Sequence, residues 1–178
     1  MNPTRLALVT GGTASGKSRW AERLALAHGK KPVYIATAQA HDDEMAIKIA
    51  QHRAGRGEKW RLIEAPFDLV WAIDTIKADE IALIDCLTMW LSNHLLAEND
   101  IATRRAELLD RMHDIAAPLI FVTNEVGQCV VPDNRLARQF QQQQGLLNQL
   151  IAARADLVVA VMSGLPLVLK GQLPEVPA

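Results

Sequence analysis

The sequence predicts an α/β fold in which a mostly parallel sheet is covered by helices on both faces. Short apolar runs alternate along the chain with segments of helical length, and uninterrupted apolar runs are typical of parallel strands buried on both sides. Hydrophobic residues make up 49% of the 178 residues, which is enough for one large core. Neither a repeat nor a linker-like stretch breaks the alternation, so residues 1–178 are expected to form one domain.

The first half of the chain gives the clearest signals for individual elements. The apolar run Leu6–Thr10 predicts a buried strand that leads into a glycine-rich turn. A helix is expected over Ser18–His28 because Trp20, Leu24 and Ala27 fall on one face. The same reasoning predicts strands at 33–37 and 81–85, a short strand at 60–64, and helices from Asp42 or Asp43 to about Arg53, at 68–75 and at 87–96.

The second half of the chain continues this alternation. Its one compositionally biased patch, formed by Gln139 and Gln141–Gln144, is interpreted as a solvated helix face. The pattern predicts helices at 104–116 and 134–154, strands at 119–123 and 157–162, and an antiparallel edge strand at 167–169.

Charge and cysteine content exclude several classes of protein. The chain has 19 Lys and Arg against 20 Asp and Glu, which removes the electrostatic case for broad nucleic-acid binding. Its two cysteines, Cys86 and Cys129, do not suit a disulfide scaffold and are compatible with a reducing cytosol. No stretch approaches the ~20 apolar residues of a transmembrane helix, and no segment resembles a targeting signal. We therefore expect a cytoplasmic protein without stable membrane insertion.

The most specific signal is a phosphate-binding loop. Residues 11–18 match the pattern G-x-x-x-x-G-K-[ST] between a predicted strand and a predicted helix. Glycines allow consecutive backbone N–H groups to face phosphate oxygens, and the helix presents its positive end to the same anion. Lys17 can reach the β- and γ-phosphates, and the Ser18 hydroxyl can ligate Mg²⁺. The predicted phosphate site consists of Gly11, Gly12, Thr13, Ala14, Ser15, Gly16, Lys17 and Ser18.

A second metal ligand is expected at the end of a neighbouring strand. Asp85 closes the apolar run that starts at Ile81, and a carboxylate there can order the water shell of Mg²⁺. The alternative is that Asp85 caps the following helix. Ligands of open α/β sheets bind beyond the carboxyl ends of the strands. Thr37, Gln39, Asn124 and Glu125 also fall there, with turn and cap roles as the alternative.

One histidine is a candidate nucleophile. His52 shares a predicted helical face with Ile49, and Arg53 and Arg56 lie close to it in the sequence. Cations beside a histidine suggest a shared anion, and a neutral imidazole can attack the α-phosphorus of a nucleoside triphosphate and displace pyrophosphate. The alternative is a histidine that only packs against the core. His41 precedes the helix and is interpreted as a loop residue.

Beyond the phosphate-binding loop, an ordered set of motifs runs through nearly the whole chain. Its members are Tyr34-Ile35-Ala36-Thr37; Asp43-Glu44-Met45 with Ile49 and His52; Asp85-Cys86-Leu87-Thr88 with Trp90-Leu91-Ser92-Asn93; Val122-Thr123-Asn124-Glu125-Val126-Gly127; and Val130-Val131-Pro132 with Asn134, Arg135 and Arg138. In this combination the sequence resembles the bifunctional adenosylcobinamide kinase/adenosylcobinamide-phosphate guanylyltransferases of cobalamin synthesis.

The resemblance implies two reactions on one corrinoid side chain. ATP or GTP first phosphorylates the aminopropanol hydroxyl of adenosylcobinamide, and GMP is then transferred from GTP to that phosphate through a guanylylated histidine. His52 matches the nucleophile of the family. The resemblance also implies a RecA-like P-loop fold, a homotrimer, and GTP, ATP and Mg²⁺ as cofactors. It places at the GTP site Thr37, Ala38, Gln39, Arg53, Ala54, Gly55, Glu64 and Asp85.

Two other functions are compatible with the residues alone. One is a simple P-loop kinase for another small metabolite, in which His52 is structural. The other is a nucleotide-dependent switch or partner-binding ATPase that has no small acceptor.

The chain also departs from the family pattern. Cys129 stands where family members often have Gly, and Gln141 and Gln142 stand where Arg-Asp is common. These departures leave open the corrinoid contacts and the roles of three further residues, which are Glu125, Arg135 and Arg138.

Overall fold

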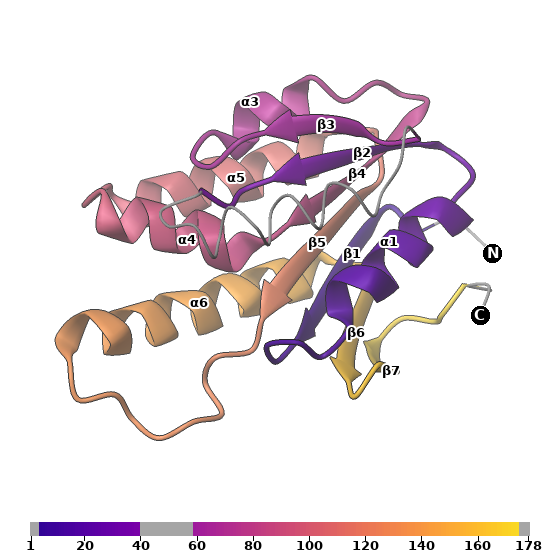
Figure 1. Ribbon diagram of the computed structural model, residues 1–178. Coiled ribbons are helices and arrows are strands. Elements are labelled where there is room, and N and C mark those ends of the chain that lie inside the picture. The colour runs from indigo at the N-terminus through magenta and orange to yellow at the C-terminus, as the bar shows by residue number, and fades with distance from the viewer. Residues whose placement is uncertain (1–3, 40–58, 175–178) are drawn as a thin grey trace.

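The computed structural model describes residues 4–39 and 59–174. Within them, one seven-stranded sheet has the strand order β3-β2-β4-β5-β1-β6-β7 (Figure 1). Every strand pair is parallel except β6–β7, which confirms the mostly parallel sheet with an antiparallel edge. The strands are β1 (Leu6–Gly11), β2 (Lys31–Ala36), β3 (Arg61–Glu64), β4 (Glu80–Asp85), β5 (Leu119–Asn124), β6 (Leu157–Met162) and β7 (Leu165–Lys170).

Helices cover both faces of this sheet. The described helices are α1 (Lys17–Ala27), α3 (Leu69–Asp74), α4 (Leu87–Leu96), α5 (Ile101–Asp114) and α6 (Arg135–Arg154). Helix α1 packs on one face, and α3 to α6 lie on the other. Strand side chains alternate between the two cores: Leu6 and Leu8 face the larger helical layer, whereas Ala7 and Val9 face α1. Burial on both faces explains why the strands read as uninterrupted apolar runs.

One helix starts earlier than the sequence pattern predicts. We expected it at 104–116, but α5 runs from Ile101 to Asp114. The cause is Asp100, whose carboxylate accepts hydrogen bonds from the backbone N–H groups of Ala102 (3.0 Å) and Thr103 (3.4 Å). Such a cap satisfies donors that a helix start leaves without partners. The helix expected between Asp42 and Arg53 lies outside the described residues.

The parallel arrangement brings several chain ends to one edge of the sheet. The phosphate-binding loop follows β1, Thr37 follows β2, Asp85 ends β4 and Asn124 ends β5. Strand β5 lies between β1 and β4, so Asp85 is one strand further from the loop than the expected neighbouring position. The candidate site residues therefore lie together at the carboxyl ends of the strands.

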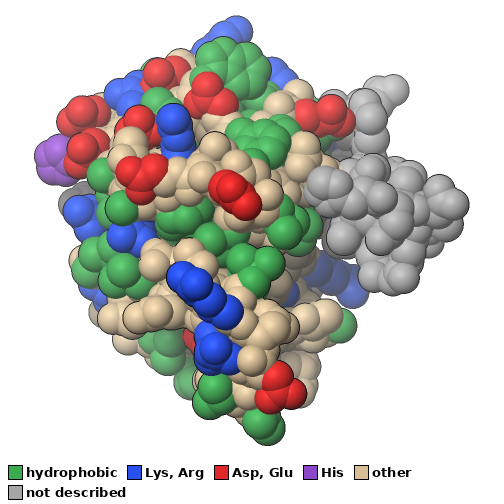
Figure 2. Space-filling model, turned by 90° about the vertical axis from the view of Figure 1, so that its left-hand side faces the viewer, with side chains coloured by type: hydrophobic (Ala, Val, Ile, Leu, Met, Phe, Trp, Pro, Cys, Tyr) green, Lys and Arg blue, Asp and Glu red, His purple; other side chains and the backbone are tan. Residues whose placement is uncertain are grey.

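Charged side chains of both signs lie on one face of the described surface. On the face shown in Figure 2, acidic and basic side chains are interspersed, and basic side chains form no continuous field over the described residues. No helix among the described residues has the length and apolar character needed to cross a bilayer.

Candidate active site

The loop between β1 and α1 has the shape that the motif requires. Ser15 N–H donates to the carbonyl of Gly12 (3.3 Å), and α1 begins at Lys17 after Gly16, whose φ of 93° is left-handed. At Gly11 a Cβ atom would lie 2.5 Å from the carbonyl oxygen of Val161 and 2.6 Å from the Ser15 hydroxyl. Only glycine fits this close approach, so residues at both ends of the loop are fixed by geometry.

The turn between β6 and β7 braces this loop. Gly164 N–H donates to the Ser15 carbonyl at 2.9 Å, and a Cβ atom at Gly16 would stand 3.2 Å from the Cα of Gly164. The loop thus packs backbone against backbone on a hairpin about 150 residues later in the sequence. Sequence reasoning did not identify Gly164, because its role depends on a contact between distant segments.

Lys17 is the buried cation of the loop. Its side chain is largely enclosed, with 9% of the residue exposed, and its Nζ donates to the carbonyl of Gly12 at 3.0 Å. Burial lowers the pKa of Lys17, and the nearby Cys86 and Asp85 act in the opposite direction. This coupling shows that Asp85 lies within electrostatic reach of Lys17 despite the strand between them.

Asp85 stands at a junction held by Thr37. The Thr37 hydroxyl donates to the Cys86 carbonyl (2.7 Å) and accepts from the Cys86 N–H (2.8 Å), and Thr37 N–H donates to the Asp85 carbonyl (3.3 Å). The N-cap of α4 is Cys86, with no side-chain cap hydrogen bond. The alternative that Asp85 caps this helix is therefore wrong, and its half-buried carboxylate is available to a metal or its water shell.

The neighbouring Cys86 thiol does not provide a second anion. Burial, reinforced by the charge of Asp85, raises the pKa of Cys86 to about 11. The thiol is therefore protonated at neutral pH, and Asp85 carries the negative charge of this junction.

The structure ties the other predicted GTP-site residues less directly to the phosphate-binding loop. Thr37 is fully buried and its hydroxyl already bonds to Cys86, so its nucleotide contact stays a prediction beside a structural role. Ala38 and Gln39 follow it and are half-buried. Glu64 is exposed at the end of β3. It is four strand spacings from β1, roughly 19 Å at ~4.8 Å per strand, which is too far to contact the same phosphates as the loop.

The candidate nucleophile cannot be placed. His52, together with Arg53, Ala54, Gly55 and Arg56, lies outside the described residues. Its role as nucleophile therefore stays a prediction from the sequence pattern.

Comparison with protein families identifies the chain. A family model described as "Cobinamide kinase / cobinamide phosphate guanyltransferase" matches residues 7–169. The chain belongs to this family. The bifunctional adenosylcobalamin biosynthesis protein CobP of Pseudomonas aeruginosa is 43% identical over 168 residues, covering 93% of this chain and 97% of the relative. The protein CobU of Escherichia coli, with the same description, is 38% identical over 179 residues, covering 92% and 98%.

Solved structures support the fold of this cobinamide kinase family member. The flagellar accessory protein FlaH of Methanocaldococcus jannaschii aligns with a TM-score of 0.53 at 14% identity, over 94% of this chain and 79% of that one. The Pyrococcus horikoshii protein PH0250 aligns with a TM-score of 0.51 at 10% identity, over 97% and 89%. Together with the P-loop and the strand order, this likeness confirms the RecA-like P-loop fold.

The residues at the loop fit the phosphates of a nucleotide. Two polar side-chain atoms at this edge, Ser15 Oγ and Asn124 Oδ1, are shielded from solvent and have no hydrogen-bond partner among the described residues. Buried polar atoms without partners are rare in folded proteins. Mg²⁺ is usually held by one or two protein oxygens together with substrate phosphates, and Ser18 and Asp85 are oxygen donors of that kind. The cradle therefore fits a nucleoside triphosphate with Mg²⁺.

A polar network behind this edge was misjudged from the sequence. Gln144 belongs to the glutamine patch that we interpreted as a solvated face, but it is fully buried. Its Nε2 donates to the Thr123 hydroxyl and to Asn148 Oδ1, both at 2.9 Å. The spacing of Gln144 and Asn148, four residues apart on one helix, was the signal that could have revealed this network.

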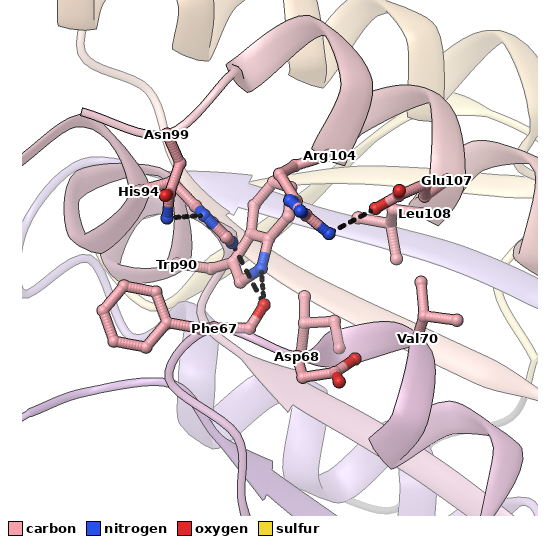
Figure 3. Close-up of a pocket in the computed structure, with 10 residues that line it drawn as sticks. Phe67, Asp68, Val70, Trp90, His94, Asn99, Arg104, Glu107 and Leu108 are labelled. Carbon is pink, nitrogen blue, oxygen red and sulfur yellow. Dashed lines mark hydrogen bonds and ion pairs between the residues drawn. The ribbon is translucent and has the colours of Figure 1, made fainter. Parts of the chain in front are cut away.

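A separate cavity of about 280 Å³ lies between α3, α4 and α5 (Figure 3). His94 lines it and is buried. Its Nε2 donates to the Phe67 carbonyl (3.0 Å), while its Nδ1 accepts from Asn99 (2.9 Å). Burial lowers the pKa of His94. Both ring nitrogens are thus occupied in the neutral form, so this histidine holds α4 in place and is not available as a nucleophile.

Proposed function

We propose that this protein phosphorylates adenosylcobinamide with ATP or GTP and then transfers GMP from GTP to the resulting phosphate. The products of the second step are adenosylcobinamide-GDP and pyrophosphate. The observation that carries the proposal is a braced P-loop that holds a buried Lys17, in a chain that matches the cobinamide kinase family over residues 7–169.

In the kinase step the chain acts by positioning and by charge. Lys17 and the loop N–H groups stabilise the charge on the transferred phosphoryl group. Ser18 and Asp85 would hold a Mg²⁺ ion, which neutralises charge on the β- and γ-phosphate oxygens when bound. The acceptor oxygen forms a bond to the γ-phosphorus, the bond to the bridging oxygen breaks, and the hydroxyl proton is released to water.

In the guanylyl step we assign the nucleophile to His52. Its neutral imidazole attacks the α-phosphorus of GTP and pyrophosphate leaves, which gives a histidine–GMP phosphoramidate. A phosphate oxygen of adenosylcobinamide phosphate then attacks the same phosphorus and releases the histidine. Arg53, the residue after His52 in the sequence, is proposed to supply positive charge for this step. The remaining proposed GTP contacts are Thr37, Ala38, Gln39, Ala54, Gly55 and Glu64.

We also assign the assembly and the location of the protein. We propose a homotrimer in the cytoplasm whose partners are small molecules. A corrinoid is large relative to 178 residues, so surfaces of neighbouring subunits are the natural place for it to dock.

The order of products tests this proposal against the two alternatives. The protein is incubated with cobinamide, Mg²⁺ and GTP, and the corrinoid products are followed by mass. We expect cobinamide phosphate first, then cobinamide-GDP with one pyrophosphate for each. Phosphorylation alone would indicate a simple kinase. Nucleotide turnover that ignores cobinamide but responds to a macromolecule would indicate a switch protein.

A further inference from the structure

The first residue of the phosphate-binding loop is bonded to a peptide group at the end of β5. Gly11 pairs with Asn124, the last residue of β5, and the Gly11 carbonyl accepts a hydrogen bond from the N–H of Glu125 (3.1 Å). A Cβ atom at Gly11 would lie 2.5 Å from the carbonyl oxygen of Val161, so the backbone here has little room to move. The start of the loop therefore depends on how the peptide group between Asn124 and Glu125 is oriented.

The other end of this peptide group is held by a side chain of α6. Asn148 Nδ2 donates to the Asn124 carbonyl at 3.2 Å. Because a peptide group is planar, its carbonyl and the N–H of Glu125 turn together. Hydrogen bonds that follow one another through an amide also polarise each other. Asn148 is thus connected to Gly11 through one rigid unit of the backbone.

Asn148 is itself held in a single orientation. Its Oδ1 accepts from the Thr123 hydroxyl (2.7 Å) and from Gln144 Nε2 (2.9 Å). Gln144 is fully buried and also donates to the Thr123 hydroxyl (2.9 Å). An amide oxygen only accepts and an amide nitrogen only donates, so turning the Asn148 amide over would break all three of its hydrogen bonds. The network therefore aims Nδ2 at the Asn124 carbonyl.

Apolar packing could not supply the same constraint. Leu147 and Ile151 of α6 belong to the larger core, and their contacts hold the helix against the sheet. Such contacts have no preferred direction, whereas a hydrogen bond fixes the direction of the carbonyl that accepts it. The amides of Gln144 and Asn148 therefore add control over a backbone orientation to a helix that is already packed.

We infer that Asn148 is a positioning residue for phosphoryl transfer, which acts through the 124–125 peptide group on the start of the phosphate-binding loop. This inference rests on the proposed function. Transfer requires close alignment of the phosphoryl group and the acceptor oxygen, and a shift of ~1 Å from a remote substitution lowers a rate by about 10²-fold. Nucleotide affinity is less sensitive, because several loop N–H groups and Lys17 share the phosphates. Asn148 itself touches no substrate and exchanges no proton.

The kinetic test compares Asn148→Ala with Ile151→Ala, three residues further along α6. Ile151 is fully buried, so its truncation loosens the packing of the helix without touching the peptide group. We expect Asn148→Ala to lower the kinase kcat by about tenfold, with the KM for GTP changed by less than about threefold. Ile151→Ala should keep a kcat near the wild-type value below its own thermal midpoint. Equal losses of kcat in the two variants, or a near-normal kcat in Asn148→Ala, would overturn the inference.

A second variant covers the case in which Asn148→Ala does not fold. Asn148→Asp keeps the size of the side chain and the oxygen that accepts from Thr123 and Gln144. It replaces the donor with an oxygen that faces the Asn124 carbonyl, so its kcat should be at least as low as that of Asn148→Ala. A wild-type kcat in Asn148→Asp would contradict the role of the Nδ2 hydrogen bond.

The amide proton of Glu125 reports on this connection without any turnover. In spectra of the ¹⁵N-labelled protein, Asn148→Ala should move this resonance upfield, because the hydrogen bond to Gly11 is no longer reinforced through the peptide group. Ile151→Ala should leave it in place. An unchanged resonance in Asn148→Ala overturns the role of Asn148 even if cobinamide phosphorylation is normal. Conversely, wild-type protein that does not phosphorylate cobinamide contradicts the proposed function, and the Glu125 resonance still decides whether Asn148 holds the start of the loop.

Discussion

Lys17 shows how one residue joins the local motif to the tertiary site. The pattern around it predicts a phosphate-binding lysine, but its surroundings come from the fold: burial lowers the pKa of Lys17, and the charge of Asp85 at the end of β4 opposes only part of that effect. A bound polyphosphate would add strong negative charge at the same place. The Lys17 ammonium group therefore lies in a partly desolvated position, where its interaction with phosphate is stronger than in water.

Removing the Lys17 ammonium should impair phosphoryl transfer. We expect Lys17→Ala to lower kcat for cobinamide phosphorylation by roughly 10²–10³-fold, because one preorganised charge at the transferred group is lost. Steady-state kinetics measures this, with Lys30→Ala as the matched control, since Lys30 bonds to the Ala78 carbonyl on the amino side of the sheet. A Lys17→Ala protein that phosphorylates cobinamide at the wild-type rate would exclude the assigned role of the loop.

Some residues of the candidate site could be predicted from the sequence, and others could not. The loop motif, Asp85 and Asn124 could be placed because each lies at the end of an apolar run, and such runs predict parallel strands. The buried Gln144 and the bracing Gly164 were missed, because their roles depend on contacts with Thr123 and Ser15 from distant segments. A polar residue type suggests exposure, and hydrogen bonds to other elements are what allow such a residue to be buried.

At the scale of elements, strand β3 is joined to β4 by an ion pair. Arg61 of β3 donates from Nε and Nη2 to the two carboxylate oxygens of Glu80 (2.9 and 2.7 Å), the first residue of β4. The carboxylate also accepts from the Lys77 N–H (2.8 Å). The hydrogen bonds from Arg61 hold the pKa of Glu80 below its usual value. Strand β3 is short and lies at the sheet edge, so this pair adds to the backbone pairing that holds it to β2.

Breaking this pair should destabilise the protein in a pH-dependent way. We expect Arg61→Ala to cost about 2 kcal/mol at pH 7, less than the ~3–5 kcal/mol of a fully buried pair because the Arg61 side chain is 40% exposed. The folded pKa of Glu80 is depressed, so its contribution is complete above the unfolded value of about 4.3 and is lost as pH falls through the folded pKa. Urea unfolding should show the difference from wild type shrinking in acid.

The control for this prediction is Arg104→Ala. Arg104 pairs with Glu107 at 2.9 Å, and both side chains are exposed, so its removal should change the free energy of unfolding little. A difference between Arg61→Ala and wild type that is constant from neutral to acid pH would contradict the assigned linkage.

Element boundaries were predicted less well than element types. The apolar runs identified the inner strands β1, β2, β4, β5 and β6, because parallel strands inside a sheet are buried on both faces. The start of α5 was missed since the decisive feature is one capping side chain, Asp100, rather than the periodic pattern. Gly145 does not interrupt α6, because tertiary packing of Leu147 and Ile151 outweighs the ~1 kcal/mol that glycine costs in a helix.

At the scale of the whole molecule, exposed apolar side chains gather on β7 and on the segment that follows β5. Every residue of β7 is exposed, and Leu165, Leu167 and Leu169 are each more than half exposed. Val130 and Val131 are 90% and 72% exposed in the segment that follows β5. Groups of exposed apolar side chains are typical of protein interfaces, in agreement with the proposed homotrimer.

The trimer can be tested by mass in solution. Light scattering on the eluting protein should give three times the 19.6 kDa of one chain, and the mass should stay constant on moderate dilution. Leu167→Glu in β7 is expected to lower the mass if this strand contributes to the interface, because a charge would be buried without a partner. A mass of one chain for the wild type would contradict the trimer.

We propose that one chain carries both reactions and uses His52 as a covalent relay. The most direct measurement is incubation with Mg²⁺ and GTP labelled at the α-phosphate, followed by denaturation and counting of protein-bound label. We expect a label on the wild type that is labile in acid and stable in base. It should be absent from His52→Ala and retained in His113→Ala, because His113 is an exposed histidine on α5. Wild-type protein without such a label, or a label that survives in His52→Ala, would contradict this proposal.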